Sequence, residues 1–236
     1  MDNWKIIWSK KNLELNSYKS LNNLIEANGF DTGFGNYTEV KWRELVYDFY
    51  KRVNFNKNAN VLELGCGSGA FLFTLNELVE ANFYGLDYSP SLIQIAKNAV
   101  PNAHLAANEA RSKAFSDIHF DVIFSHSVFQ YFPDTQYAED VITNWCNKIK
   151  KGGKFVLLDI NDKEKEEDYH NERMQTYENP EEYFNMYKGL RHLFFDKTYL
   201  KEIFKKCGMN GIEIFPHAVA DYGISRFRFN IICTKI

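Results

Sequence analysis

The chain has 236 residues, enough for one sizeable α/β domain but short for two full ones. Its net charge is −3 and its pI about 6.1, so it lacks the basic field that holds a nucleic-acid backbone. The 4 cysteines are scattered without a CxxC pair, which argues against a structural zinc site and a disulfide framework. No secretory signal pattern or membrane-length apolar run is seen. We therefore expect a cytoplasmic protein with no membrane or nucleic-acid partner.

The first 58 residues carry no strand pattern, and apolar residues at helical spacing predict two short helices within them. The glycine-rich stretch 28–37, NGFDTGFGNY, predicts a loop. Thr38 or Asn36 would then cap a third helix that runs to about Arg52.

From residue 60, short apolar strands alternate with helices. This alternation predicts right-handed crossovers and a parallel sheet that is covered on both faces. The predicted strands are 61–64, 82–86, 104–107, 120–124 and 154–159, and the helices between them are 70–78, 89–99 and 137–150.

The segment 161–192 interrupts the alternation with charged and polar residues set between aromatic ones. It predicts a helical insertion, which is either a solvated element or a lid. In the lid interpretation a side chain such as Tyr169, His170, Tyr177 or Tyr183 faces a bound substrate.

The chain closes with a helix that ends at Gly208 and two β-rich stretches, 212–216 and 227–234. We expect one domain over 1–236. Its four parts are a helical N-terminal cap (1–58), a ligand-binding core (59–160), the insertion (161–192) and a C-terminal helix with strands (193–236).

The strongest motif is VLELGCGSGA, over residues 61–70, in which an apolar strand turns sharply into a helix. Glycine permits such a turn and lets a ligand approach the backbone, because it has no Cβ. The helix that follows presents unpaired N–H groups at its start. Asp87, at the end of the next predicted strand, can accept both ribose hydroxyls of a nucleoside. Together these features predict a nucleotide-like ligand.

Two cofactor classes fit this spacing. Gly65-x-Gly67-x-x-Ala70 also satisfies the dinucleotide fingerprint, so an NAD-dependent oxidoreductase stays an alternative. Glu63 favours the other class, because its carboxylate would repel a pyrophosphate and attract the ammonium of an amino-acid moiety. A non-catalytic binding subunit is a third possibility, although its expected loss of the glycines or of Asp87 is not seen.

Four motifs, ELGCGSG (63–69), Asp87, Asn108-Glu109-Ala110 and DVIFSHSVFQY (121–131), together resemble the class I S-adenosylmethionine-dependent methyltransferases. The resemblance implies a Rossmann-like fold, with a seven-stranded, mostly parallel sheet and an antiparallel last strand. It also implies that S-adenosylmethionine is the cofactor and S-adenosylhomocysteine its product. The implied cofactor-binding residues are Glu63, Gly65, Cys66, Gly67, Asp87, Tyr88, Ser89, Asn108, Glu109, Ala110, Ser125 and His126.

This resemblance implies a role for each group. Gly65 and Gly67 would lie against the methionine portion, Asp87 would hold the ribose, and His126 would lie near the sulfonium. The adenine-side residues depart from the family pattern, which often has Asp where this chain has Asn108-Glu109. Which of the two contacts adenine is therefore left open.

The N-terminal NWKIIW and GFDTGFG segments are similar to methyltransferases of bacterial surface-polysaccharide clusters. That similarity implies a small-molecule acceptor, with the methyl group placed on an oxygen of a sugar or of a phosphoramidate-type group. A neutral hydroxyl acceptor needs a general base. His126, after the fourth strand, is the first candidate and His170, in the insertion, the second; each is also consistent with a purely structural role.

Four further residues are candidate substrate contacts: Phe30, Tyr37, Tyr131 and Arg226. Asp159 and Asp162 follow the fifth strand but have no His or Cys partner in the pattern, so we expect no metal site.

Overall fold

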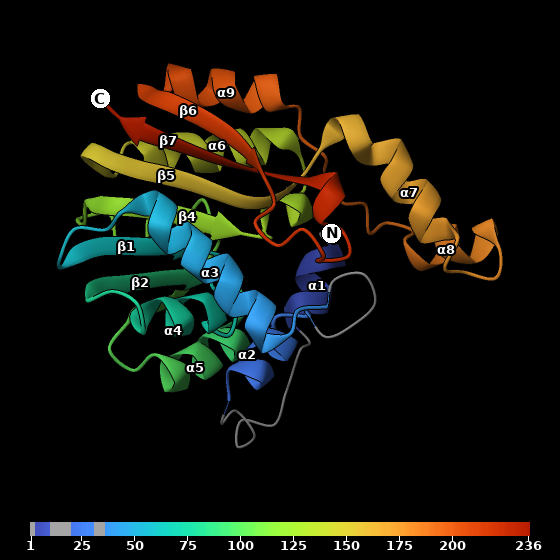
Figure 1. Cartoon of the computed structure of the whole chain (residues 1–236), viewed down its shortest axis with the longest axis horizontal. Helices are drawn as coiled ribbons and strands as arrows, with labels where there is room; N and C mark the ends of the chain where they lie inside the picture. The colour runs from blue at the N-terminus through green and yellow to red at the C-terminus, as the bar shows by residue number, and fades with distance from the viewer. Residues whose placement is uncertain (1–2, 10–19, 31–35) are drawn as a thin grey trace.

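The computed structural model describes residues 3–9, 20–30 and 36–236. A seven-stranded sheet in the order β3-β2-β1-β4-β5-β7-β6 runs through the molecule (Figure 1). The first four strands are β1 (Ala59–Leu64), β2 (Ala81–Asp87), β3 (His104–Ala107) and β4 (Phe120–His126). The others are β5 (Ile149–Asn161), β6 (Met209–Pro216) and β7 (Arg228–Lys235).

The predicted Rossmann-like sheet is confirmed, including its antiparallel last strand. β1 to β5 pair in parallel, whereas β7 lies between β5 and β6 and is antiparallel to both. Because β7 runs in the opposite direction, its first residues lie beside the end of β5, where Asn161 is paired with Arg228.

Helices cover both faces of the sheet (Figure 1). One layer holds α2 (Leu21–Ala27), α3 (Glu39–Val53), α4 (Ala70–Asn76) and α5 (Pro90–Ala99), and the other holds α6 (Thr135–Cys146) and α9 (Lys197–Lys206). Successive strand side chains alternate between the layers, as Val61 and Leu62 do. Both faces are buried, which explains why these strands are apolar without alternation.

Side-chain caps set where several helices begin. Thr38 accepts the N–H of Lys41 at the start of α3, as the sequence predicts, and Asp134 accepts the N–H of Tyr137 at the start of α6. The prediction that the sixth helix extends to Lys150 is wrong. α6 ends at Cys146 and β5 begins at Ile149, because Ile149 pairs with Phe120 in the sheet.

Two further groups of helices lie at the edge where the parallel strands end (Figure 1). One is α1 (Asn3–Ser9) and the other is the insertion, which folds into α7 (Glu166–Met174) and α8 (Pro180–Met186). Tyr169 and Tyr183 of the insertion are buried, and the ring of Tyr169 packs against Phe194 and Phe227. Among the described residues, no helix is long and apolar enough to cross a membrane.

Replacing Ile142 with Ala tests the α6 layer of the core. Ile142 is fully buried between α6 and the sheet, so we expect a loss of about 2–5 kcal/mol in the free energy of unfolding, measured by urea denaturation. The control is Val40→Ala on the exposed face of α3, where a change within about 0.5 kcal/mol is expected. Equal midpoints for the two variants would contradict this packing.

Candidate active site

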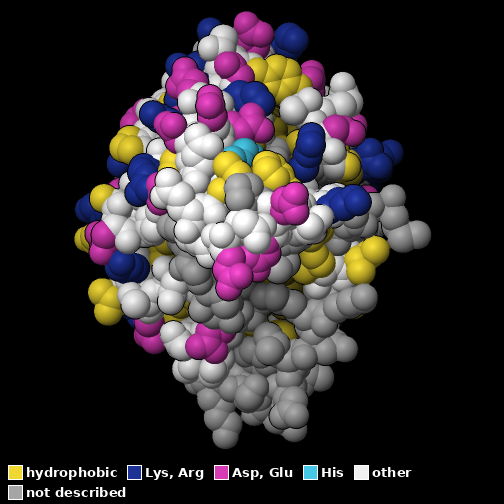
Figure 2. All heavy atoms as spheres, turned by 90° about the vertical axis from the view of Figure 1, so that its right-hand side faces the viewer, with side chains coloured by type: hydrophobic (Ala, Val, Ile, Leu, Met, Phe, Trp, Pro, Cys, Tyr) yellow, Lys and Arg dark blue, Asp and Glu magenta, His cyan; other side chains and the backbone are white. Residues whose placement is uncertain are grey.

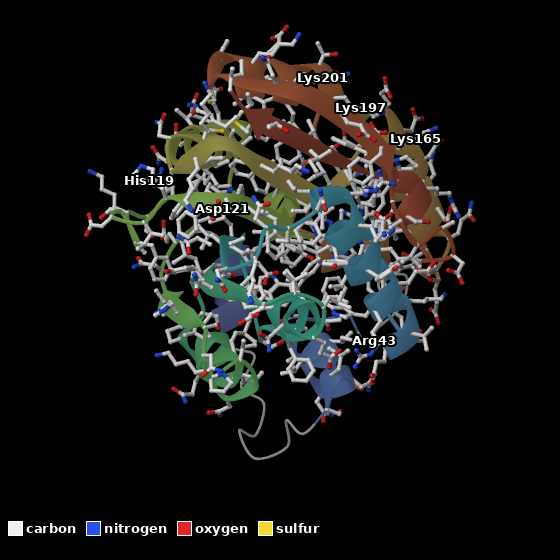
Figure 3. The ribbon with its side chains drawn as sticks, turned by 60° about the vertical axis from the view of Figure 1, so that its left-hand side comes forward. Arg43, His119, Asp121, Lys165, Lys197 and Lys201 are labelled. Atoms are coloured by element: carbon white, nitrogen blue, oxygen red, sulfur yellow. The ribbon has the colours of Figure 1, made fainter. Side chains whose placement is uncertain are left out.

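A cavity of about 290 Å³ lies at the carboxyl ends of β1, β2 and β4, where ligands bind in open α/β sheets. Figure 2 looks onto this side of the molecule, and its upper part carries acidic and basic side chains intermixed. His119 and Asp121, labelled in Figure 3, lie at the start of β4, at the opposite end of that strand from the cavity.

The glycine turn forms one wall of the cavity. Gly65 and Gly67 have φ angles of 78° and 52°, a backbone conformation that residues other than glycine rarely adopt. A Cβ at Gly65 would overlap the side chain of Val128, and one at Gly67 would overlap Asn28. Asn28 Oδ1 also accepts the N–H of Ser68 at 2.7 Å. Helix α2 and the turn therefore form one packed unit that a ligand can approach through the glycines.

Asp87, at the end of β2, lies beside this turn. Its Oδ2 accepts the N–H of Gly67 and its Oδ1 accepts the N–H of Ser89, both at 2.9 Å. Burial raises the pKa of Asp87 to about 6, although the two hydrogen bonds favour the ionised form. Each carboxylate oxygen can accept more than one hydrogen bond, so Asp87 can still bind a ribose diol.

Glu63 also faces the cavity and is buried, and its Oε2 has no hydrogen-bond partner in the described part of the chain. Burial, and secondly the charge of Asp87, raise the pKa of Glu63 well above its usual range. A cationic group beside Glu63 would offset both the burial of its carboxylate and the repulsion by Asp87. These residues therefore fit the ammonium group of S-adenosylmethionine, whereas the pyrophosphate of NAD would meet two acidic side chains.

The other end of the cavity is suited to an adenine ring. Tyr88, Glu109, Ala110 and Tyr137 line it. Asn108 is exposed and is absent from the described lining, and its N–H donates to the backbone oxygen of Asp87 at 2.8 Å. Of the adjacent pair Asn108 and Glu109, the structure therefore places Glu109 at the cavity.

Helix α1 closes the cavity on this side. Trp8 lines it, and the backbone oxygens of Trp4 and Trp8 accept hydrogen bonds from Tyr88 and Ser89, each at 3.4 Å. Trp4 also stacks on His192, with ring centroids 4.8 Å apart. The helix therefore joins the adenine end to the residues that follow the insertion.

His126 lies at the end of β4 and lines the cavity, with its ring packed among Phe30, Trp42 and Phe71 at centroid distances of 5.3–5.6 Å. Its Nε2 has no hydrogen-bond partner among the residues that the structure describes. Burial lowers the pKa of His126 to about 4, so the imidazole is neutral at pH 7.

Three of the residues implied as cofactor contacts do not appear in the described lining of the cavity. Ser125 is buried and donates to the backbone oxygen of Leu64 at 2.8 Å. Ser89 caps α5, and Cys66 is buried beneath the turn.

The candidate substrate residues are divided. Phe30 and Tyr131 line the cavity, whereas Tyr37, His170 and Arg226 do not appear in its described lining. Tyr37 is buried and hydrogen-bonded to His217 at 2.9 Å. His170 is hydrogen-bonded to Tyr183, and Arg226 forms an exposed ion pair with Glu172. Residues 31–35 of the glycine-rich loop lie outside the described residues.

Sequence reasoning missed two groups of residues. Asn28, Trp42 and Val128 line the cavity but were not among the candidate site residues, although Asn28 begins the glycine-rich stretch and Val128 lies within the 121–131 motif. Beyond His126, Asp159 and Arg228 form a buried ion pair, with Nε and Oδ1 3.5 Å apart. These two come from β5 and β7, 69 residues apart, and no local pattern connects them.

Comparison with known proteins agrees with this geometry. The family model described as "Methyltransferase domain" matches residues 55–208. The demethylmenaquinone methyltransferase of Geobacillus sp. (strain WCH70) is 30% identical over 127 residues, 51% of this chain and 52% of that protein. The chain spans about half the length of this curated relative, and 44% and 28% of an uncharacterised Schizosaccharomyces pombe methyltransferase and an Arabidopsis thaliana phosphoethanolamine N-methyltransferase that it also matches.

Solved structures share the fold. A putative methyltransferase in complex with the Haloferax volcanii Trm112 activator has a TM-score of 0.65 and 16% identity, with 91% of this chain and 97% of that chain covered. The S-adenosylmethionine-bound aminopentose methyltransferase CalS10 of Micromonospora echinaspora has a TM-score of 0.60 and 13% identity, with 83% and 92% covered. With the family match over its core and a cavity that fits the cofactor, the chain belongs to the class I S-adenosylmethionine-dependent methyltransferases.

Proposed function

We propose that the chain transfers a methyl group from S-adenosylmethionine to an oxygen of a small-molecule acceptor. One observation carries this proposal: a single cavity joins two carboxylates, those of the buried Glu63 and the half-buried Asp87, to a neutral imidazole, that of His126. The resemblance of the N-terminal segments supports a sugar hydroxyl or a phosphoramidate-type group in surface-polysaccharide synthesis as the acceptor.

The chain's own residues would bind and align the reactants. S-adenosylmethionine, when bound, supplies a methyl group on a good leaving group. Glu63 would pair with its ammonium group, and Asp87 would accept its ribose hydroxyls. Phe30 and Trp42 give the cavity apolar walls that exclude water. Alignment in such a site is worth up to about 7–11 kcal/mol of the barrier.

His126 is the residue that we propose as the proton acceptor. Its Nε2 would take the hydroxyl proton of the acceptor, because it is buried at the cavity and has no hydrogen-bond partner in the described ranges. Its lowered pKa makes it a weak base that is unprotonated throughout the neutral range. The hydroxyl proton would move to His126 Nε2 as the new carbon–oxygen bond forms.

Replacing Asp87 with Asn tests cofactor binding. The amide cannot accept as two charged oxygens do, so the affinity for S-adenosylhomocysteine, measured by isothermal titration calorimetry, should fall about 10- to 100-fold. The matched control is Asp117→Asn, an exposed residue before β4, and its affinity should match the wild type. Binding of NAD in place of S-adenosylhomocysteine would overturn the proposal.

The pKa of Asp87 predicts how pH affects cofactor binding. Because this pKa is about 6 in the ligand-free protein and the ligand favours the ionised carboxylate, binding releases a proton below pH 6. The dissociation constant for S-adenosylhomocysteine should therefore rise between pH 7 and pH 5, by up to about tenfold per unit below pH 6. Calorimetry over this range should give a flatter profile for Asp87→Asn. An unchanged slope would assign the proton to Glu63.

Replacing His126 with Asn tests the proton acceptor. Methyl transfer, followed with radiolabelled S-adenosylmethionine and a panel of methyl glycosides, nucleotide sugars and phosphorylated acceptors, should fall about 10²- to 10⁴-fold. The affinity for S-adenosylhomocysteine should stay within about threefold of the wild type. Full activity in the variant would exclude His126 as the base. A wild-type protein that binds the cofactor but methylates none of the panel would favour a non-catalytic subunit.

A further inference from the structure

Beyond His126, the ends of β4 and β5 and the start of β7 bring together a second set of buried polar groups. Asp159 is fully buried, and its Oδ1 lies 3.5 Å from Nε of Arg228 and 3.8 Å from Nε2 of His217. Within the described residues, neither carboxylate oxygen of Asp159 has a hydrogen-bond partner, and neither does Nε of Arg228. The pair is therefore close in space but incompletely hydrogen-bonded.

The backbone holds Asp159 in this position. Asp159 has a φ of 60° and lies where the β5–β7 register shifts, between Leu157 and Ile160. The side chain of Asn230 fixes the kink, since its Oδ1 accepts the N–H of Asp159 at 2.8 Å and its Nδ2 donates to Pro216 at 3.0 Å. A bulge of this kind redirects a side chain, and a left-handed residue other than glycine costs about 1–3 kcal/mol. Such a cost at a strand end is typical of functional sites.

The neighbouring strand kinks at the same level. His126 pairs with Leu158, and Ser127 has a φ of 56°, one residue beyond that pair just as Asp159 is. The side chain of Gln130 donates to Ser127 Oγ at 2.7 Å. Both strands therefore have a left-handed residue at the same level, close to their carboxyl ends.

Further buried polar atoms without partners belong to this second set. Gln130 Oε1, Asn161 Oδ1 and Nε2 of His192 are buried without a hydrogen-bond partner in the part of the chain that the structure describes. Gln130 and Asn161 are neighbours, because Leu193 donates its N–H to the backbone of Gln130 at 2.9 Å and accepts from Asn161 Nδ2 at 2.8 Å.

This set adjoins the cofactor cavity. His126 lines the cavity, and the charge of Asp159 acts on it. Tyr131 also lines the cavity, and its ring lies 5.3 Å from that of His192. We name the set Asp159, Arg228, Gln130, Asn161 and His192 the polar wall. None of these five residues appears in the described lining of the cavity, so the polar wall reaches the cavity through His126 and Tyr131.

An unpartnered buried polar group costs about 1–3 kcal/mol, so five residues with such atoms in one place indicate a site that a ligand completes. An ion pair kept only for stability would be expected to have its remaining donors and acceptors satisfied. In this pair they are not. A ligand that donates to the free oxygens and accepts from the guanidinium would remove the cost.

The composition of the wall selects the ligand. The charges of Asp159 and Arg228 cancel, and burial lowers the pKa of His126, His192 and His217, so these rings are neutral at pH 7. Acceptor oxygens outnumber donors, since Asp159, Gln130 and Asn161 present four oxygens, against one N–H of Arg228 and Nε2 of His192, which donates or accepts according to the ring tautomer. A dianionic group such as a phosphate would face the carboxylate, whereas hydroxyl groups supply the missing donors.

We infer that the polar wall binds the methyl acceptor, and that the acceptor is an uncharged, hydroxyl-rich molecule with one hydroxyl held between Asp159 and Arg228. That hydroxyl donates to Asp159 and accepts from Arg228. The acceptor enters from the cavity, past the rings of His126 and Tyr131. This inference rests on the proposed methyl transfer, and within that proposal it selects a sugar hydroxyl over a phosphoramidate-type group.

Direct binding tests the inference without turnover. With the protein saturated in S-adenosylhomocysteine, calorimetry would compare a panel of neutral methyl glycosides with the matching sugar phosphates. We expect at least one neutral glycoside to bind, and to bind more tightly than its phosphate. Asp159→Asn should weaken that binding at least tenfold and leave S-adenosylhomocysteine affinity within threefold. Preference for the phosphates, or binding of no neutral glycoside, would overturn the inference.

Two further variants keep the test sharp. Asp162→Asn is the matched control, because this nearby carboxylate is paired with Lys197 at 2.7 Å and lies outside the polar wall; it should bind the glycoside as the wild type does. Should Asp159→Asn unfold, Gln130→Leu removes a wall oxygen, together with the hydrogen bond to Ser127 Oγ, and leaves both members of the charge pair in place; it should weaken glycoside binding several-fold. Unchanged binding in a folded Gln130→Leu would count against the wall. Failure of the wild-type protein to bind S-adenosylhomocysteine would instead contradict the proposed function.

Discussion

The carboxylate of Asp87 is the interaction on which the cofactor half of the molecule depends. It accepts the N–H of Gly67 from the turn after β1 and the N–H of Ser89 at the start of α5. Its backbone oxygen accepts the N–H of Asn108, just after β3. One residue of the connection after β2 is therefore hydrogen-bonded to the connections after β1 and β3. The ligand that Asp87 would bind meets a surface already organised by the same side chain.

Burial gives this arrangement its chemical character. Glu63 and Asp87 are both held where water is largely excluded, so the pKa of each carboxyl is raised and each gains by meeting a positive charge or a hydroxyl donor. His126, which lines the same cavity, is kept neutral by burial. The cavity therefore combines groups that attract a cationic cofactor with a ring that can receive a proton.

Local signals in the sequence were enough to predict the sheet and several residues that line the cavity. Gly65, Gly67 and Asp87 can be recognised from the sequence, because each lies within a few residues of a predicted strand end, where a glycine conformation or an acidic charge is needed. The Thr38 cap was predictable for the same reason, since its hydrogen bond spans three residues. The false extension of α6 arose where a strand pairing, that of Ile149 with Phe120, overrides the local pattern.

The polar wall could not be predicted in this way. Asp159 and Arg228 meet only because β7 is inserted between β5 and β6 in the opposite direction. Neither residue belongs to a motif. In the sequence, Asp159 was considered only together with Asp162, as a metal site that the pattern did not support. Contacts set by strand order carry no short-range signature, so they need the assembled sheet to be seen.

The reversed direction of β7 has a consequence for how such an enzyme can diversify. The cofactor-side groups come from β1, β2 and the turns after them, whereas Arg228 and Asn230 come from the far end of the chain. Substitutions in β7 would thus change the proposed acceptor site and leave the glycine turn and Asp87 in place. The topology therefore draws the proposed cofactor-binding and acceptor-binding groups from separate parts of the chain, so changes near its C-terminus would alter the second set without replacing the first.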